Sequence, residues 1–361
     1  MSRFSLLGKI TLASVIGQLI IVAVLESLVI YFHVEFVGNF ILDEFGDGIS
    51  QVDLIYHLIF IATFVFQVLM CIDALINKNP IQLIALVIFN LLTLLYAIIQ
   101  LHQHEILEDE GTESAKFIPS NRFKNREKVK IYFEARLRPL EYTILAFIST
   151  FSVFLAFMAY KLYSEMEWDN YKKYTGDIRI RKAFVTLSIL QTLIKMDIFF
   201  IGAYAIQLIP SQKMGYSIIE TIIIFVLGVT LLLMSWVAVS REKKYVLLSN
   251  INSIVISIIY IIYKLFRVNL HPSSSDCYRF TRIIITFFLV TTFVLISATL
   301  VYSIICFSNM TKGIYVFEVY NNNDTDIENS SPNSNNTKRY SKKLSLKRKQ
   351  QHISSDKMII N

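Results

Sequence analysis

The sequence predicts an all-α membrane protein, a polytopic bundle of transmembrane helices followed by a disordered polar tail. Of its 361 residues 54% are hydrophobic, and the mean hydropathy is +0.51, more apolar than is usual for soluble domains. Charged residues make up 17% and fall between long apolar blocks, as a bilayer requires. The blocks are continuously apolar rather than alternating, which favours helices over β-barrel strands.

A span needs about 20 mostly apolar residues. Seven blocks meet this need clearly: 11–32, 54–76, 81–101, 140–163, 183–209, 216–239 and 283–307. An eighth block, 246–266, contains several serine and asparagine side chains, so it either crosses the bilayer, lies in the interface or lines a polar interior. The connection Asn77–Pro80 between two of these blocks is so short that the two spans must form a tight helical hairpin. We favour eight spans and keep seven as the alternative.

The Lys and Arg content of the loops indicates orientation. Loop 33–53 has no Lys or Arg and five acidic residues, which places it in the lumen and the N-terminus in the cytosol. Eight spans then put the basic loops 164–182 and 240–245 in the cytosol. Loop 102–139 fits badly, because it is basic and yet lumenal. A seven-span topology with a lumenal N-terminus moves this loop to the cytosol but exposes 164–182 to the lumen.

Residues 311–361 form the tail, a polar low-complexity stretch followed by a basic cluster at 338–349. The tail has too few apolar residues to form a core, and we therefore expect it to be disordered. The basic cluster predicts a cytosolic tail that binds anionic lipids or cytosolic proteins. Asn309, close to the end of the last span, and the tail residues Asn323, Asn329 and Asn335 match the N-glycosylation pattern, and we expect all four to be unmodified. The lipid bilayer itself is the other expected partner, and no nucleic-acid motif is present.

Two charged residues, Lys195 and Asp197, lie about halfway through the fifth span. A charge at the centre of an inserted helix costs roughly 2.5–3.5 kcal/mol. Residues two apart on a helix point to different faces, so each needs a partner on another helix, and Gln67 and Asn90 are the candidates. We favour a structural polar clasp over a substrate, ion or proton site. In either case Lys195→Leu and Asp197→Leu should impair folding or activity.

Two glutamates, Glu26 and Glu220, complete the candidate intramembrane polar site, and we expect both to snorkel to the lumenal interface. Histidines also gather at lumenal ends: His33, His57, His102, His104 and His271. Such groups can bind zinc or manganese or sense acidification. Their spacing matches no strong metal motif, however, so we interpret them as unconnected interfacial histidines. We predict no metal, no cofactor and no catalytic residue, and no enzyme signature is present.

The run WDNYKKYTGDIRIR at 168–181, followed by LIKMDIFF at 193–200 and by Gln207, resembles the fungal Golgi apparatus membrane protein family. This is an uncharacterised multi-pass family without assigned activity. The resemblance is most specific over 168–207, and it implies a fungal source and a Golgi membrane location. It implies no biochemical function and no site residues.

Three functional classes follow. The first is a non-catalytic Golgi membrane protein in trafficking or membrane organisation, which we favour. The second is a transporter or an ion- or proton-conducting protein that uses Lys195 and Asp197. The third is a seven-span receptor, which needs a lumenal N-terminus and no span at 246–266. Convergence of Lys195 and Asp197 with other polar groups around a cavity would favour transport, whereas direct pairing would favour the structural role.

Overall fold

The computed structural model describes residues 5–42, 44–113, 115–173, 178–207, 218–240, 243–270 and 281–312. The predicted tail from residue 313 onward and His271 lie outside these ranges. The described residues form eight helices and two short strands, listed here with their bounds: α1 (Leu6–Val37), β1 (Phe40–Ile41), α2 (Glu44–Ile76), α3 (Pro80–Glu113), β2 (Lys116–Phe117), α4 (Arg126–Lys173), α5 (Ile178–Gln207), α6 (Ile218–Ser240), α7 (Lys244–Asn269) and α8 (Arg282–Thr311).

The predicted all-α polytopic fold is confirmed. Seven of the described helices are long and apolar enough to cross a membrane. The other, α6, has 23 residues, but its side chains are described without a break only over Gly228–Val237. The uncertain block at 246–266 lies within α7, which is one of the seven. The seven-span topology required no span there, so the described helices favour eight.

The helices extend beyond the apolar blocks that predicted them. The fourth span was expected to begin at residue 140, yet α4 begins at Arg126 and includes Pro139. Hydropathy detects only the stretch inside the hydrocarbon, whereas a helix with charged flanks continues into water. The basic loop 102–139 is therefore mostly helical, since α3 also continues to Glu113.

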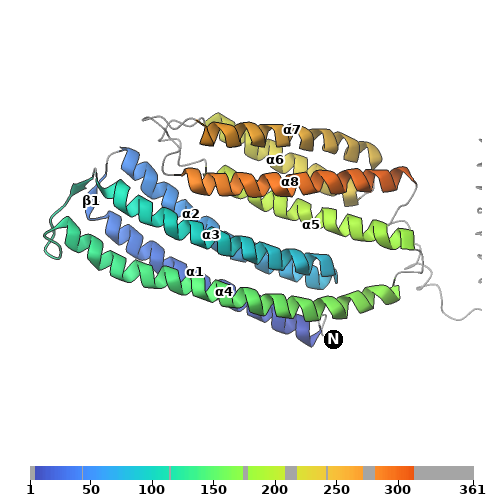
Figure 1. Ribbon diagram of the computed structural model, residues 1–361, viewed down its shortest axis with the longest axis horizontal. Coiled ribbons are helices and arrows are strands. Elements are labelled where there is room, and N and C mark those ends of the chain that lie inside the picture. Colours follow the sequence, from blue (N-terminus) through green and yellow to red (C-terminus); the bar gives the residue numbers. More distant parts are fainter. Residues whose placement is uncertain are drawn as a thin grey trace, which may run out of the picture. The chain divides into compact units, whose positions relative to one another are not determined.

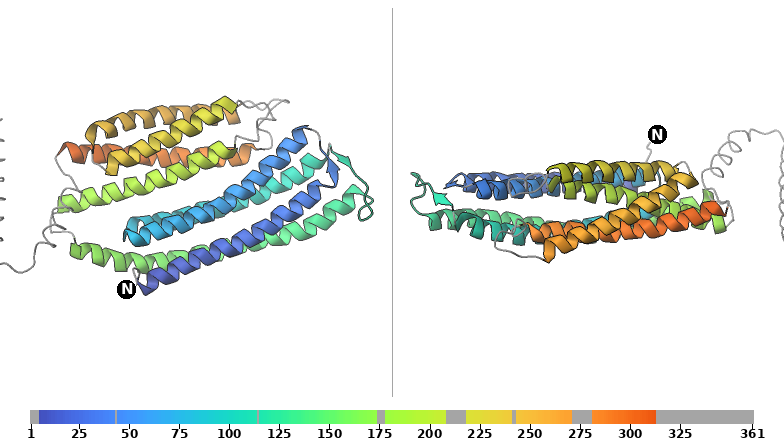
Figure 2. Two further views of the ribbon diagram at one scale, coloured as in Figure 1. Left: turned by 180° about the vertical axis from the view of Figure 1, so that it is seen from behind. Right: turned by 90° about the horizontal axis from the view of Figure 1, so that it is seen from above.

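The first four helices form one group and the last four form another. In the first group α1 and α3 each pack against both α2 and α4. In the second group α5 and α7 each pack against both α6 and α8. Contacts between the groups are made by α2 and α3 with α5, and by α3 with α8 (Figures 1 and 2). Aromatic rings line this contact, with Phe66 stacked on Phe199 and Phe89 edge-on to Phe200.

Strands β1 and β2 close one end of the first group. They pair antiparallel, with Phe40 opposite Phe117 and Ile41 opposite Lys116. Beneath them the ring of Phe36 contacts those of Phe40 and Phe133. Because the acidic loop 33–53 belongs to this end, the predicted topology makes it lumenal.

Two of the basic residues that fitted the predicted topology badly have local partners at this end. Arg122 forms an ion pair with Glu35 at 2.9 Å and lies over the ring of Tyr132. Arg126 donates a hydrogen bond to the carbonyl of Ala115. These contacts give two of the basic residues of loop 102–139 partners within the protein, while the side of the membrane on which the loop lies stays a prediction.

Candidate functional site

A group of buried or half-buried polar side chains lies between helices α1–α4, toward the end that carries β1 and β2. We call it the histidine–carboxylate cluster. It receives side chains from all four helices of the first group, and its members are Glu26 and His33 from α1, Asp53 and His57 from α2, Gln100 and His104 from α3, and Arg138 and Glu141 from α4.

The helical spacing of these residues brings them into the core. Glu26 and His33 are seven residues apart and lie on the same buried stripe as Val22, Val29 and Phe36. Asp53 and His57 are four apart, as are Gln100 and His104, and residues at this spacing share one helix face. Each of these helices therefore presents two polar groups on its inward face, two turns apart on α1 and one turn apart on α2 and α3.

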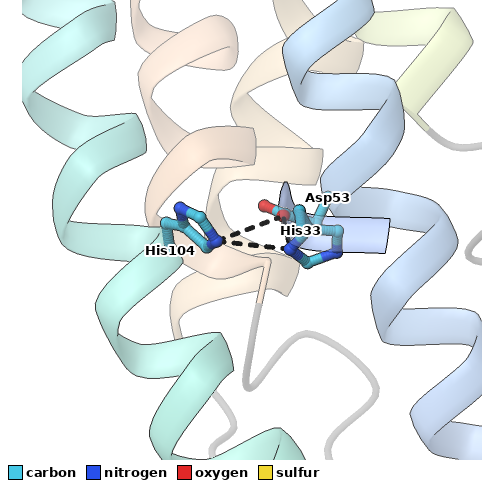
Figure 3. A group of neighbouring side chains, drawn as sticks. All are labelled: His33, Asp53 and His104. Atoms are coloured by element: carbon cyan, nitrogen blue, oxygen red, sulfur yellow. Dashed lines mark hydrogen bonds and ion pairs between the residues drawn. The ribbon is translucent and has the colours of Figure 1, made fainter. Parts of the chain in front are cut away.

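At the centre of the cluster His33, Asp53 and His104 meet from three helices (Figure 3). Nδ1 of His33 lies 3.3 Å from Nε2 of His104 and 3.3 Å from Oδ2 of Asp53. Nε2 of His104 lies 4.0 Å from the same carboxylate oxygen. All three residues are buried, so two imidazole nitrogens and one carboxylate oxygen face a shared point.

On one side of this centre, His57 connects Asp53 to Glu26. Its Nδ1 lies 2.6 Å from Oε1 of Glu26, and its Nε2 lies 3.5 Å from Oδ2 of Asp53. Gln100 donates a hydrogen bond to the same Glu26 oxygen at 3.0 Å. A cavity of about 20 Å³, large enough for about one water molecule, is lined by Glu26, His57, Gln100 and Glu141.

On the other side, His104 is held by a charged pair on α4. Its Nδ1 contacts Oε1 of Glu141, whose second oxygen accepts a hydrogen bond from Arg138 at 2.7 Å. This contact fixes the His104 ring so that its Nε2 points toward His33 and Asp53. The cluster is thus a continuous chain of polar side chains from Arg138 to Glu26.

Several atoms of the cluster lack a hydrogen-bond partner among the described residues. They include both oxygens of Asp53, Nε2 of His33, Nε2 of His57 and Oε1 of Gln100. The Asp53 carboxylate is within 3.5 Å of two imidazole nitrogens, yet neither approach has hydrogen-bond geometry. A buried carboxylate without hydrogen bonds is costly, so the site has capacity for a further polar ligand.

The predicted Lys195 site is a contact between the two groups of helices. Nζ of Lys195 forms an ion pair with Asp73 of α2 and donates a hydrogen bond to Oε1 of Gln82 of α3 at 3.2 Å. It also lies 5.2 Å from the ring centroid of Trp236 on α6. This is direct pairing, the arrangement that favours a structural clasp.

Asp197 points elsewhere, as the spacing predicted, and is fully buried. It accepts a hydrogen bond from Thr299 of α8 at 2.5 Å, while its other oxygen has no partner among the described residues. A second cavity of about 20 Å³ touches Asp197, Ser235, Asn250 and Thr299. Lys195 and Asp197 therefore do not form one site.

The other candidate partners serve different contacts. Gln67 donates to Thr93, and Asn90 accepts from Gln18 and donates to Ser152. The proposed pairing of Gln67 and Asn90 with Lys195 or Asp197 was wrong, because these polar groups form their hydrogen bonds within α1–α4. Glu220 lies in α6, but its side chain is outside the described part of the chain.

Two further expectations are corrected. Glu26 does not snorkel: it is 3% exposed, because His57 and Gln100 offer it partners inside the bundle. The histidines are not all unconnected either, since His33, His57 and His104 converge, while His102 is 62% exposed and contacts Glu105. The i,i+4 pairs on α2 and α3 were the signal in the sequence that could have indicated this convergence.

Comparison with known proteins gives one relevant relative. The chain is 26% identical to a UPF0658 Golgi apparatus membrane protein of Schizosaccharomyces pombe over an alignment of 279 residues, which covers 74% of the chain and 78% of the relative. This similarity confirms the resemblance to the fungal Golgi apparatus membrane protein family and the multi-pass Golgi membrane location. No family model and no solved structure matches the chain.

Proposed function

We propose that this chain, a multi-pass Golgi membrane protein by its similarity to the fungal relative, is a carrier for an inorganic cation, with the histidine–carboxylate cluster as its binding site. One observation supports this most directly. Asp53 is a buried carboxylate that lies beside the imidazoles of His33 and His104, and the three residues come from three membrane-spanning helices. Its oxygens have no hydrogen bond among the described residues.

The charges of the cluster favour a positively charged ligand. The three carboxylates of Glu26, Asp53 and Glu141 face three imidazoles and a single guanidinium, that of Arg138. Uncompensated charge among membrane-spanning helices is expensive, and such residues mark ion pathways by default. A bound cation would offset the negative charge of these carboxylates.

The size and place of the cluster favour a small ion over an organic substrate. The cavity beside Glu26 and His57 has room for about one water molecule. The cluster lies toward the end of α1–α4 that the topology makes lumenal, so we expect the ion to exchange with the Golgi lumen. We propose no catalytic step at this cluster.

Uptake into proteoliposomes tests the carrier. Purified full-length protein should raise the initial rate of uptake of at least one of Na⁺, K⁺, Ca²⁺, Mn²⁺ and Zn²⁺ above that of protein-free vesicles. Asp53→Asn keeps the shape of the side chain and removes its charge, so it should lower that rate at least 10-fold. His102→Gln changes an exposed histidine on the same helix as His104 and should leave it unchanged. Rates equal to protein-free vesicles for all five ions would refute a carrier.

A second candidate is the non-catalytic role in trafficking or membrane organisation, and the clasp at Lys195 favours it. In this case the basic cluster 338–349 binds anionic lipids or cytosolic proteins, and the polar groups serve packing alone. A deletion and a point variant, both expressed in cells, separate the two proposals. Deletion of 338–349 should disturb Golgi organisation while Asp53→Asn does not, whereas the carrier predicts that Asp53→Asn alone removes function.

A further inference from the structure

We infer that His33, Asp53 and His104 form a binding site for a divalent transition-metal ion of the zinc type. This inference rests on the proposed function, since it names the class of cation that the carrier would take. It is also separable from it, because a metal site can exist in a protein that transports nothing.

The spacing of the three ligand atoms is the first support. Nδ1 of His33, Nε2 of His104 and Oδ2 of Asp53 form a triangle with sides of 3.3, 3.3 and 4.0 Å. A point equally distant from the three corners of this triangle, in its plane, lies about 2.1 Å from each, close to Zn–N distances of about 2.0–2.1 Å and Zn–O distances of about 2.0–2.2 Å. An ion fits between the three atoms with little movement of the helices.

The chemistry of the ligands selects among cations. Two imidazole nitrogens with one carboxylate oxygen suit zinc and neighbouring transition metals. Calcium and magnesium instead prefer shells made of oxygen, and calcium takes about 6–8 of them. The histidine pair therefore favours zinc-type ions over the alkaline earths.

The surrounding contacts orient the ligands as metal sites require. Histidines that bind metals usually donate their other ring nitrogen to a carboxylate or carbonyl, which fixes the ring. His104 has this arrangement, with Nδ1 on Glu141 and Glu141 in turn on Arg138. The Nε2 atom of His104 is thereby left facing the centre of the triangle.

The site leaves one coordination position for exchange. Three protein ligands with an open fourth position are typical of catalytic zinc sites, where water or substrate exchanges at that position. Structural zinc sites have four protein ligands. His57 can supply the fourth ligand, because its Nε2 is 3.5 Å from Oδ2 of Asp53 and has no hydrogen-bond partner among the described residues. A shift between three and four protein ligands would allow the ion to be taken up and released.

Metal binding to the full-length protein in detergent tests this site without any transport assay. The protein is stripped with a chelator and dialysed against Zn²⁺, Mn²⁺ or Ca²⁺, and bound metal is measured by elemental analysis. We expect one Zn²⁺ per chain, with Ca²⁺ binding at least 10-fold weaker. Asp53→Asn and His33→Gln should each weaken Zn²⁺ binding at least 10-fold, and Glu141→Gln should weaken it about 10–100-fold, as for other outer partners of metal ligands.

His102→Gln is the matched control, since it removes an exposed histidine two residues before His104 and should leave Zn²⁺ binding unchanged. Binding of Co²⁺ in place of Zn²⁺ gives a readout independent of affinity. The folded wild-type protein should show the visible absorption of a four-coordinate Co²⁺ site, and Asp53→Asn, shown to be monodisperse, should lose it. Equal Zn²⁺ binding by the wild type, Asp53→Asn and His33→Gln would mean an adventitious ion only and would overturn the inference.

The two proposals fail in different ways. Zinc binding that depends on Asp53, without uptake of any ion, would support the metal site and refute the carrier. Uptake of Na⁺ or K⁺ that depends on Asp53, without zinc binding, would support the carrier and refute the metal site.

Discussion

Glu141→Leu is expected to lower the free energy of unfolding of the metal-free protein by about 3–5 kcal/mol, the cost of removing one partner from a buried charged pair. Glu141 accepts from Arg138 and contacts His104, and its side chain is only 9% exposed. The leucine would leave the Arg138 guanidinium without this carboxylate and would release the His104 ring. A titration with a denaturing detergent, followed by tryptophan fluorescence or helix content, measures the loss.

Two neighbouring variants make the result specific. Glu141→Gln keeps a hydrogen-bond acceptor and the side-chain volume, so it should be less destabilising than the leucine. Tyr142→Leu changes the next residue, which is exposed, and should alter stability by less than about 0.5 kcal/mol, as is usual for surface substitutions. If Glu141→Leu is as stable as Tyr142→Leu, the Arg138–Glu141–His104 chain does not contribute to folding.

Lys195→Glu is expected to be the most damaging single substitution at the contact between the two groups of helices. It would place a carboxylate beside Asp73 and Gln82, where the lysine now forms its ion pair. Like charges set against each other cost several kcal/mol when desolvated. Because the Lys195 and Asp73 side chains are 20% and 37% exposed, solvent should reduce the effect to about 1–3 kcal/mol.

Reversing the pair distinguishes a clasp from general damage. The double variant Lys195→Glu with Asp73→Lys should recover most of the lost stability, because it restores an ion pair with exchanged signs. Lys161→Glu, an equal charge change at an exposed lysine on α4, should have little effect. A double variant no more stable than Lys195→Glu alone would show that Lys195 acts through something other than Asp73.

Lys195→Leu and Asp197→Leu should differ in their effect on stability. Lys195→Leu leaves Asp73 unpaired but partly hydrated, so a moderate loss of stability follows. Asp197 is different, because it is buried with a single described partner, Thr299. Asp197→Leu removes a poorly satisfied buried carboxyl group but also the acceptor of the Thr299 hydroxyl, so the two effects oppose each other and we expect a smaller loss of stability than for Lys195→Leu.

Much of the fold was determined by the sequence itself. A bilayer imposes a length and an apolar composition on every span, so eight blocks in the sequence correspond to α1–α8. The direction of Lys195 and Asp197 toward different partners also followed from local geometry alone, because the rotation per residue of a helix is constant.

Tertiary structure alone decided which polar groups meet. The sequence shows that Asp53 and His57 share a face of one helix and that Gln100 and His104 share a face of another, but nothing local specifies which helices are neighbours. That depends on the packing of α1 and α3 against α2 and α4, which brings His33, Asp53 and His104 from positions 33, 53 and 104 to one point. Spacing along the chain identifies a metal site when the ligands lie on one element. Here each of the three ligands comes from a different helix, so their convergence results from the packing of the bundle.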